Sequence, residues 1–426
     1  MNTKVASPAG RRQAKETEPR SALSYKEALA WLYSLQRFGI KLGLENIRRL
    51  IDELHVDLAK ARVIHVAGTN GKGSVCAMID SIARAQGHRS GLFTSPHLVT
   101  FRERIRVNGE MIAQSAVTSG LTAIRKLVGT WEPHPTFFEV TTALALKYFS
   151  EAEIDIVILE TGLGGRLDAT NAVQSNVAVI TPIDFDHQKW LGDSLDKIAG
   201  EKAGIIKRRV PVVSAPQPPM AEGVIRARAL ERRAPIQFVN ERYDQTPMAL
   251  HGAHQKQNAA LALAALRAAK IDVNDFAIVR GLLSVEWPAR FQRWDQCTFI
   301  DGAHNPVAAR VLASTWRESF GGQPTSLVLA ILSDKDLRGI CEALAPITDH
   351  VFLPRIGTER AANPQELAKI LLNLGVKCQV GGTLPGALEK ARLRSAPMLI
   401  TGSLHFAGEA LAHLRGEPAA FEECAQ

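Results

Sequence analysis

The chain has 426 residues, of which 46% are hydrophobic and 22% charged, a balance that suits two or three globular domains and excludes a disordered protein. No apolar run approaches the roughly 20 residues needed to cross a bilayer, and the N-terminus lacks the apolar stretch of a secretory signal, so we expect a cytoplasmic protein without a membrane partner. The net charge of +8 raises nucleic acid as a partner, but no dense Lys/Arg run with interleaved aromatic residues accompanies it, and an enzyme with anionic substrates would carry the same charge. We therefore expect no nucleic-acid partner.

The first half of the chain predicts an α/β domain. Residues 1–22 are polar and charged and predict a flexible tail. An amphipathic helix is expected from "SYKEALAWLYSL", with Ser24 as its cap, and a second helix after the glycine-bearing turn in "RFGIKLGLENIRRLIDEL". The strand "ARVIHVAG", a glycine-rich turn, the helix "GSVCAMIDSIARAQG" and the strand "SGLFT" then form a βαβ unit. Further strands at 154–160, at 177–181 and in "VPVVSA", with helices in "SLDKIAGEKAGIIK" and "HQKQNAALALAALRAA", predict a doubly wound parallel sheet.

Pro288 and a polar run in "EWPARFQRWDQ" interrupt this pattern, and a second α/β series follows, from "CTFIDG" to "PMLITG". We expect the domain boundary within 284–296 and divide the chain into the tail 1–22, a central domain 23–290 and a smaller Rossmann-like C-terminal domain 291–426. Five cysteines are dispersed without a C-x-x-C pair, which indicates free thiols in a reducing compartment and neither disulfides nor a zinc site.

The turn in "HVAGTNGKGSVCAMI" resembles a phosphate-binding loop but departs from the usual pattern. In that pattern the lysine is followed by Ser or Thr, whose hydroxyl holds Mg²⁺, and a glycine stands six residues before it. Here Gly73 follows Lys72, and Val66 occupies the earlier position. Backbone N–H groups of 69–74 could still converge on an anion at the helix N-terminus, with Lys72 as a point charge for phosphate oxygens. The alternative is a tight turn whose glycines serve geometry alone.

Polar residues at the carboxyl ends of the predicted strands could replace the missing hydroxyl. Ser95 follows "SGLFT", although taken by itself this residue is better explained by a Ser-Pro turn that merely ends the strand. Glu160 ends a buried strand before the glycine-rich "TGLGGRLDATNAV", and a carboxylate there can ligate Mg²⁺. Asp184, Asp186 and His187 follow the next strand, where the histidine could be a metal ligand, a general base or a polar loop residue.

Four further positions carry candidate chemistry. Lys202, next to Glu201, lies in a helix of otherwise small and apolar residues, which raises carbamylation of its amine into a metal-binding anion. Asn258 is placed at a helix start, and Asp301 ends a strand where a carboxylate commonly accepts a hydrogen bond from a ribose hydroxyl. Arg290 lies in the expected linker, where it could clamp phosphates between the domains.

Taken together, GTNGKGS, TSPHL, TFFE, ETGLGGRLDATN, DH-x-x-x-LG, EKAGI, WPARFQ, DGAHNP and SDKD occur in the order seen in one family. From about Tyr25 to about Leu414 the chain resembles the folylpolyglutamate synthases, including the bifunctional dihydrofolate synthases, of the Mur ligase superfamily. The resemblance implies a P-loop-type ATPase domain and a glutamate-ligase domain. It implies ATP and two Mg²⁺ ions as cofactors, with a folate or pteroate and L-glutamate as small-molecule substrates, and we expect a monomer.

The resemblance also implies a role for each matching residue. The metal ligands would be Ser95, Glu160 and His187, and the catalytic residues Lys72, an N-carboxylated Lys202, and His304, which helps to bind glutamate. ATP would be bound by Thr69, Asn70, Gly71, Lys72, Gly73, Ser74, Asn258, Arg290 and Asp301. The folate would be bound near Phe137, Phe138, Glu139, Leu167, Asp168 and Ala169.

Two departures from the family pattern stand out. The family often has Pro-Gly-Arg where this chain has Pro288-Ala289-Arg290, and a glycine is missing from "IDFDH", so the linker backbone could shift and the second loop could be stiffer. The implied reaction forms an acyl phosphate from the substrate carboxylate and ATP, which the amine of L-glutamate then attacks. A ligase acting on a UDP-sugar is the rival within the superfamily, but TSPHL, TFFE and GRLDATN favour folate and we expect no UDP-binding domain before the loop. A nucleotide-binding regulatory protein is a rival from another class.

Overall fold

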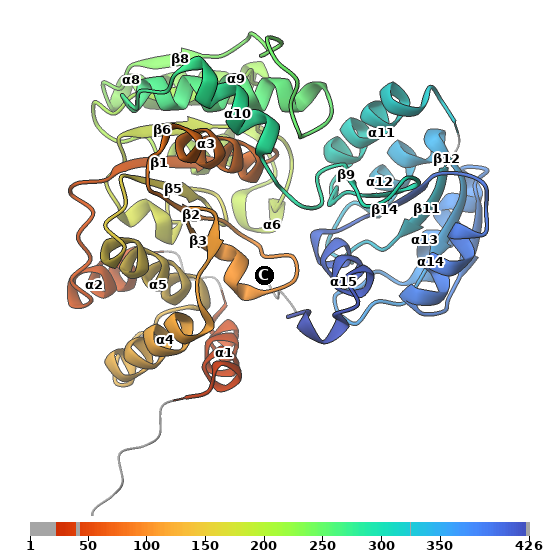
Figure 1. Cartoon of the computed structure of the whole chain (residues 1–426), viewed down its shortest axis with the longest axis horizontal. Helices are drawn as coiled ribbons and strands as arrows, with labels where there is room; N and C mark the ends of the chain where they lie inside the picture. Colours follow the sequence, from red (N-terminus) through yellow and green to blue (C-terminus); the bar gives the residue numbers. More distant parts are fainter. Residues whose placement is uncertain (1–22, 40–42, 324, 423–426) are drawn as a thin grey trace, which may run out of the picture.

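A computed structural model describes residues 23–39, 43–323 and 325–422, so the tail predicted for 1–22 lies outside the described residues. The described residues form two lobes, each built around its own sheet and joined by the chain that leaves α10 (Figure 1). Within these residues, no helix is both long and apolar enough to span a membrane.

The first lobe contains an eight-stranded sheet with the order β4-β3-β2-β5-β1-β6-β7-β8. Its strands are β1 (Arg62–Ala67), β2 (Ser90–Phe93), β3 (Ile105–Val107), β4 (Glu110–Met111), β5 (Ile156–Glu160), β6 (Val177–Ile180), β7 (Val212–Ser214) and β8 (Ile236–Phe238). All of its pairs are parallel except those of β3, which runs antiparallel to β2 and to β4. The register of β1 on β5 pairs Val66 with Glu160, so this carboxylate lies beside the strand that leads into the glycine-rich loop.

Helices cover both faces of this sheet because its central strands are apolar on both sides. The helices and 3₁₀ turns of this lobe are α1 (Tyr25–Ser34), η1 (Leu35–Phe38), α2 (Glu45–Glu53), α3 (Lys72–Gln86), η2 (Phe101–Arg104), α4 (Gln114–Val128), α5 (Phe137–Glu151), η3 (Ala169–Ala172), α6 (Gln188–Leu191), α7 (Leu195–Ala203), α8 (Pro219–Glu231), α9 (Ala253–Ala268) and α10 (Asp275–Ser284). One core joins α3, α9 and α10 to the sheet, and a second core on the opposite face joins α1, α2, α4 and α5 (Figure 1). A smaller core packs α7 and α8 against β6 and β7.

The second lobe is a six-stranded sheet with the order β13-β12-β11-β14-β10-β9, parallel except for β9. Its strands are β9 (Gln292–Arg293), β10 (Thr298–Ile300), β11 (Thr325–Leu329), β12 (Thr348–Leu353), β13 (Lys377–Val380) and β14 (Met398–Thr401). Its helices and 3₁₀ turns are α11 (Pro306–Phe320), α12 (Leu337–Leu344), η4 (Ala345–Ile347), α13 (Pro364–Asn373), α14 (Leu384–Arg392), α15 (Leu404–Leu414) and η5 (Pro418–Ala420). Helices α11–α13 pack on one face and α14 and α15 on the other. The predicted fold class, a doubly wound first domain followed by a smaller Rossmann-like domain, is confirmed.

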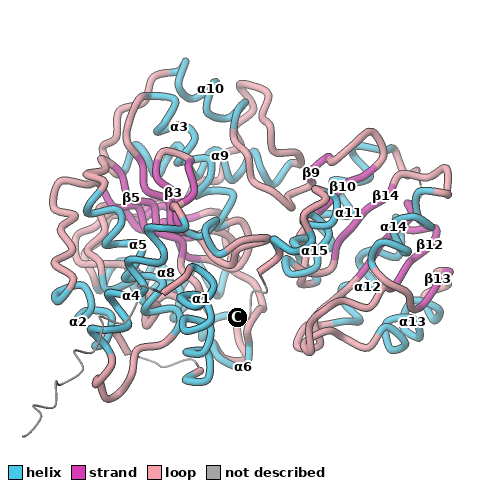
Figure 2. Tube along the Cα trace, turned by 60° about the horizontal axis from the view of Figure 1, so that its bottom comes forward, coloured by secondary structure: helices cyan, strands magenta, loops and turns pink. Residues whose placement is uncertain are grey.

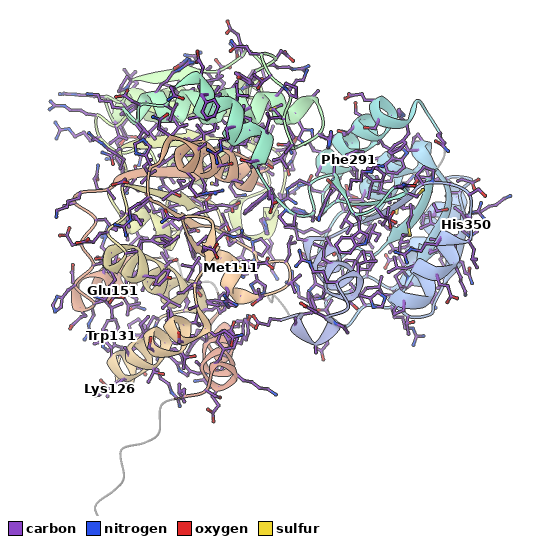
Figure 3. All side chains as sticks on the ribbon, viewed as in Figure 1. Met111, Lys126, Trp131, Glu151, Phe291 and His350 are labelled. Atoms are coloured by element: carbon purple, nitrogen blue, oxygen red, sulfur yellow. The ribbon has the colours of Figure 1, made fainter. Side chains whose placement is uncertain are left out.

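The linker between the lobes contains an alanine in a backbone conformation that favours glycine. Ala289 has φ +55° and is fully buried, and its carbonyl accepts hydrogen bonds from Gly302 N and Arg290 Nη1. A left-handed alanine costs about 1–2 kcal/mol, which burial of its methyl group partly offsets. The left-handed turn is therefore kept without glycine. Just beyond it, Phe291 packs its ring on Phe299 and Trp316. Figure 3 shows Phe291 where the second lobe begins.

A second connection between the lobes follows β2. Val99 is buried in the core of α14 and α15, and the backbone of Leu98 lies so close to Gly408 of α15 that an added Cβ would stand 1.9 Å from the Leu98 carbonyl oxygen. Glu422, beyond η5, donates its N–H to the Val99 carbonyl, and its own carbonyl oxygen lies 2.9 Å from His97 Nε2. The second lobe thus holds residues 95–101 of the first lobe, which we call the 95–101 segment. Figure 2 shows α15 on the side of the second lobe that faces the first.

Candidate functional site

A cavity of about 310 Å³ lies between the lobes, at the carboxyl ends of β1, β5 and β6 and beside the N-terminus of α11. Parallel sheets bind ligands at this edge. We refer to it as the inter-lobe cavity. Many of the predicted site residues line it, namely Thr69, Asn70, Gly71, Lys72, Gly73, Ser74, Ser95, Glu160, His187, Lys202, Asn258, Arg290, Asp301 and His304.

The glycine-rich loop owes its shape to close neighbours. Gly68 has φ +149°, and a Cβ there would lie 1.9 Å from Thr181 Oγ1, so only glycine fits. Gly71, with φ +90°, is the N-cap of α3, and Lys72 is the first residue of that helix. The Lys72 ammonium donates to the carbonyls of Gly68 (3.2 Å) and Thr69 (3.3 Å), which holds it over the helix N-terminus. The loop therefore presents both a positive helix end and a lysine to the cavity.

Ser95 and Glu160 meet at the carboxyl ends of β2 and β5. The Ser95 backbone N–H donates to Glu160 Oε2 at 3.2 Å, and the buried Ser95 hydroxyl has no hydrogen-bond partner among the described residues. Burial raises the pKa of Glu160, although the nearby Lys72 ammonium opposes that rise. An unpartnered hydroxyl oxygen beside a buried carboxylate fits a hard cation such as Mg²⁺, which prefers oxygen ligands and would satisfy both groups.

The described residues contain no cluster of three or more His, Cys, Asp or Glu side chains that could hold an ion unaided. A serine, a glutamate and the oxygens of a bound phosphate would complete such a site together, as is usual for Mg²⁺. His187 lines the same cavity from the turn after β6, with φ +50° and a half-exposed side chain. The left-handed histidine shows that this turn, like the linker, takes a glycine-like conformation without glycine.

Asp186 is where the two lobes meet across the cavity. Its carboxylate lies 2.9 Å from Lys335 Nζ and 3.7 Å from His304 Nε2, and Asn305 Nδ2 donates to it at 3.4 Å. Burial alone would raise the pKa of Asp186, but the facing His304 imidazole and the charges of His187 and Lys335 hold it well below its usual range. The carboxylate is therefore ionised and carries three contacts from the second lobe.

Lys202 is a buried lysine of α7 whose amine donates to the Gly68 carbonyl at 2.8 Å. Burial and the charge of Lys72 lower its pKa to about 7, so a substantial part of the amine is neutral near neutral pH. The neutral form is the one that reacts with CO₂ to give a carbamate. Glu201 instead turns outward and pairs with Arg166 at 2.8 Å.

The cavity side of the second lobe is held by local hydrogen bonds. Asp301 accepts from the N–H groups of Phe291 (2.7 Å) and Ala303 (2.8 Å), and burial raises its pKa against the charge of Arg290. His304 Nδ1 lies 2.9 Å from the Gly302 carbonyl oxygen, which orients the ring toward Asp186. Asn258 was predicted at a helix start, but it lies in the second turn of α9. Its Oδ1 would lie 2.8 Å from a Cβ placed on Gly71.

The predicted folate residues do not line the inter-lobe cavity. Phe137, Phe138 and Glu139 form the first turn of α5, where Glu139 is buried and completes a capping box with Thr136. Asp168 is buried and accepts from the N–H groups of Gly162, Leu163 and Thr170. These two carboxylates hold their own loops, and the adjoining Leu167 and Ala169 precede and begin η3. The Phe138 ring borders Gly162, which does line the cavity, so this group adjoins it.

Three residues that contact lining residues of the cavity had no role in the sequence prediction. Lys335 belongs to the quoted motif SDKD, but its contact with Asp186 joins positions far apart in the chain. Trp287 lies against Gly73, where a Cβ would stand 2.8 Å from its Nε1, and Asn305 Nδ2 donates to Asn70 Oδ1 at 3.1 Å. A lysine between two aspartates just after a strand was the available signal for Lys335.

Comparison with known proteins agrees with this geometry. The Mur ligase middle domain matches residues 66–213, and the Mur ligase glutamate ligase domain matches residues 289–403. The dihydrofolate synthase/folylpolyglutamate synthase of Bacillus subtilis is 34% identical, over 90% of this chain and 97% of that protein.

Two solved structures of relatives are similar throughout. Escherichia coli FolC, in complex with DHPP and ADP, has a TM-score of 0.83 at 33% identity, over 91% of this chain and 98% of that one. The bifunctional folylpolyglutamate synthase/dihydrofolate synthase of Yersinia pestis, complexed with AMPPNP and a manganese ion, has a TM-score of 0.84 at 31% identity, over 94% of this chain and 100% of that one. The resemblance read from the motifs is confirmed: the chain belongs to the dihydrofolate synthase/folylpolyglutamate synthase family of Mur ligases.

Proposed function

We propose that this protein is an ATP-dependent ligase that joins L-glutamate to a folate or to dihydropteroate by an amide bond, releasing ADP and phosphate. The observation that supports this most directly is the inter-lobe cavity, where the glycine-rich loop, Lys72, Ser95 and Glu160 from the first lobe face Arg290, Asp301 and His304 from the second. The Escherichia coli relative binds ADP and DHPP, and the Yersinia relative binds an ATP analogue with a divalent ion.

The residues can support the reaction as follows. The substrate carboxylate attacks the γ-phosphate of ATP, ADP leaves, and an acyl phosphate forms; the glutamate amine then attacks the acyl carbon, loses a proton and displaces phosphate. Lys72 and the N-terminus of α3 stabilise the phosphate charge through the first step. Arg290 lies at the cavity wall, where it can hold phosphate oxygens bidentately.

Ser95 and Glu160 would hold one Mg²⁺ on the phosphate side. His187 would serve a second Mg²⁺, which an N-carboxylated Lys202 would orient. When bound, these ions neutralise negative charge on the phosphates during transfer. His304 lies on the opposite wall, where the incoming glutamate would enter, and Lys335 pairs with the cavity residue Asp186. Contact between the lobes there would exclude water from the acyl phosphate. That the protein is a monomer stays a prediction. The dispersed free thiols support a cytoplasmic location.

The test is a turnover assay with the purified chain, ATP, Mg²⁺ and ¹⁴C-glutamate, run with dihydropteroate, with tetrahydrofolate, with a UDP-sugar acid and with no acceptor. We expect labelled product and one phosphate per amide bond only when an acid acceptor and glutamate are both present. Phosphate release that ignores both acceptors would indicate a nucleotide-binding regulator. Label transfer to a UDP-sugar acid in place of the folates would assign the chain to the rival branch of the superfamily.

A further inference from the structure

A second cavity, of about 340 Å³, lies on the first lobe among α2, η3, the α7–β7 connection and the end of α8. It shares no lining residue with the inter-lobe cavity. We call it the basic cavity, because its charged lining residues are all cations and include no acid: Arg48, Arg166, Lys207, Arg208, Arg228 and Arg232.

The positive charges of the basic cavity are only partly balanced. Glu201 pairs with Arg166, and Glu231 serves both Arg228 (2.6 Å) and Arg232 (3.7 Å). Among the described residues, no ion pair involves Arg48, Lys207 or Arg208. Six cations converging on two acids repel one another, and this repulsion opposes folding unless an anion enters.

Lys207 is repelled by two other cations of the basic cavity, Arg48 and Arg232. Its side chain is half-buried, and its ammonium donates to the Asn171 carbonyl at 2.6 Å. Burial and the charges of Arg48 and Arg232 lower its pKa to about 8. An anion in the cavity would reverse that change, because it would favour the charged ammonium.

Asn171 adds an unmet hydrogen-bonding group. The residue is 6% exposed, and its Nδ2 donates to the carbonyls of Arg166 (2.9 Å) and Gly204 (3.3 Å). Its Oδ1 and the Nε of Arg232 are both buried without a hydrogen-bond partner among the described residues. A buried polar atom without a hydrogen bond is destabilising, so a ligand that offered both a donor and an anionic acceptor would satisfy both atoms at once.

We infer that the basic cavity binds a small polyanion that also carries an N–H or O–H donor. Hydrogen phosphate has this chemistry, and so does a γ-linked chain of glutamates, whose carboxylates suit arginine and whose amide N–H suits the Asn171 acceptor. Only the glutamyl source rests on the proposed function. The cavity is too small for a nucleic-acid duplex, and no aromatic side chain lines it for base stacking.

The experiment measures binding of inorganic phosphate and of γ-linked triglutamate to the full chain by isothermal titration calorimetry. It is run in wild type and in a Lys72→Ala background that weakens anion binding at the inter-lobe cavity. In both backgrounds we expect Lys207→Gln with Arg232→Gln to weaken binding by roughly 10- to 100-fold, as loss of charge-assisted hydrogen bonds implies. Arg48→Gln, on the exposed surface of α2, should weaken it less and serves as a second variant should the double variant unfold.

Arg233→Gln is the matched control, since Arg233 is exposed, follows Arg232 and does not line the cavity. Binding of only one probe assigns the source, phosphate or glutamyl chain. If neither probe binds, or if Arg233→Gln weakens binding as much as the Lys207→Gln, Arg232→Gln double variant does, the inference is wrong. Ligase turnover is measured on the same variants, and because they lie outside the inter-lobe cavity it should be retained. Absent turnover in wild type with intact phosphate binding would overturn the proposed function and leave the basic cavity standing.

Discussion

The two lobes contribute to the inter-lobe cavity in different ways. In the first lobe, the carboxyl ends of β1, β2 and β5 bring the glycine-rich loop, Ser95 and Glu160 together through neighbouring strands of one sheet. In the second, His304 and Lys335 follow β10 and β11 and reach across to Asp186 of the first lobe. The first lobe therefore forms a phosphate site from its own residues. The second lobe contributes His304 and Lys335 to the site only when the two lobes are in contact.

The largest expected effect comes from removing a charged side chain of the phosphate site in the first lobe. We expect Lys72→Ala to lower kcat by at least ~1000-fold, because several kcal/mol of charge stabilisation is lost during phosphoryl transfer. Glu160→Ala should have an effect of similar size. Steady-state phosphate release measures both, with Lys147→Ala, which removes a partly exposed lysine of α5, as the control that should keep full activity. Activity near normal in Lys72→Ala would remove the phosphate-site assignment.

Lys202 tests whether the first lobe needs a modified side chain. Lys202→Ala should lower kcat by roughly 100-fold or more if a carbamate orients an ion there, a loss typical of a metal-site partner. Added acetate should restore part of the activity, since it fills the gap with a carboxylate. Equal concentrations of chloride are the control. Failure of acetate, together with an unmodified amine in the wild-type protein by ¹³C NMR after ¹³C-bicarbonate labelling, would count against the carbamate.

Lys335 tests whether the second lobe contributes to the use of glutamate and not to nucleotide binding. Lys335→Ala should lower kcat/KM for glutamate by roughly 10- to 100-fold, because one partner of a mostly buried ion pair is lost. Nucleotide affinity, measured by titration with ADP, should change far less than in Lys72→Ala. Arg338→Ala is the control, as Arg338 is exposed and its one ion pair among the described residues is with its helix neighbour Glu342. Equal losses of ADP affinity in Lys335→Ala and Lys72→Ala would show that the lobes do not divide the work in this way.

The smallest expected effect concerns pH. The pKa of Lys202 is about 7, below the usual lysine value, so its amine is mostly charged at pH 6 and mostly neutral at pH 8. Only the neutral amine takes up CO₂. At equal dissolved CO₂ the initial rate of carbamate formation, followed by ¹³C NMR, should therefore rise about tenfold from pH 6 to pH 8, as one titration with that pKa requires. A rise that continues unchanged toward pH 10 would show an ordinary lysine.

Local patterns predicted the parts of this fold that local forces decide. The strands β1, β5, β6 and β7 are runs of β-branched and apolar residues, and α3 begins at a glycine turn and ends at Gly87. By contrast, nothing predicted α5, because it is buried nearly all round and so lacks a polar face to reveal its period. The α4, α8 and α10 helices, the β3–β4 hairpin and β8 were likewise not predicted, and the helix expected over "SLDKIAGEKAGIIK" ends at Ala203.

The candidate site shows the same division. Glu160, Ser95 and Lys72 could be placed from the sequence, because parallel strands end at one edge and the loop follows the first of them. The pairing of Lys335 with Asp186, and the hydrogen bonds that engage Asp168 and Glu139 within their own loops, could not, since they depend on tertiary packing between distant segments. The roles assigned to individual site residues stay predictions until the variants are measured.

The 95–101 segment has a mechanical consequence. Its first residue offers an oxygen to the phosphate side of the cavity, while Leu98 and Val99 are embedded against α15 and beside Glu422. Only two residues separate Ser95 from Leu98. A rotation of the second lobe would therefore also move the Ser95 oxygen. The segment thereby couples the orientation of the second lobe to the position of the Ser95 hydroxyl in the first lobe.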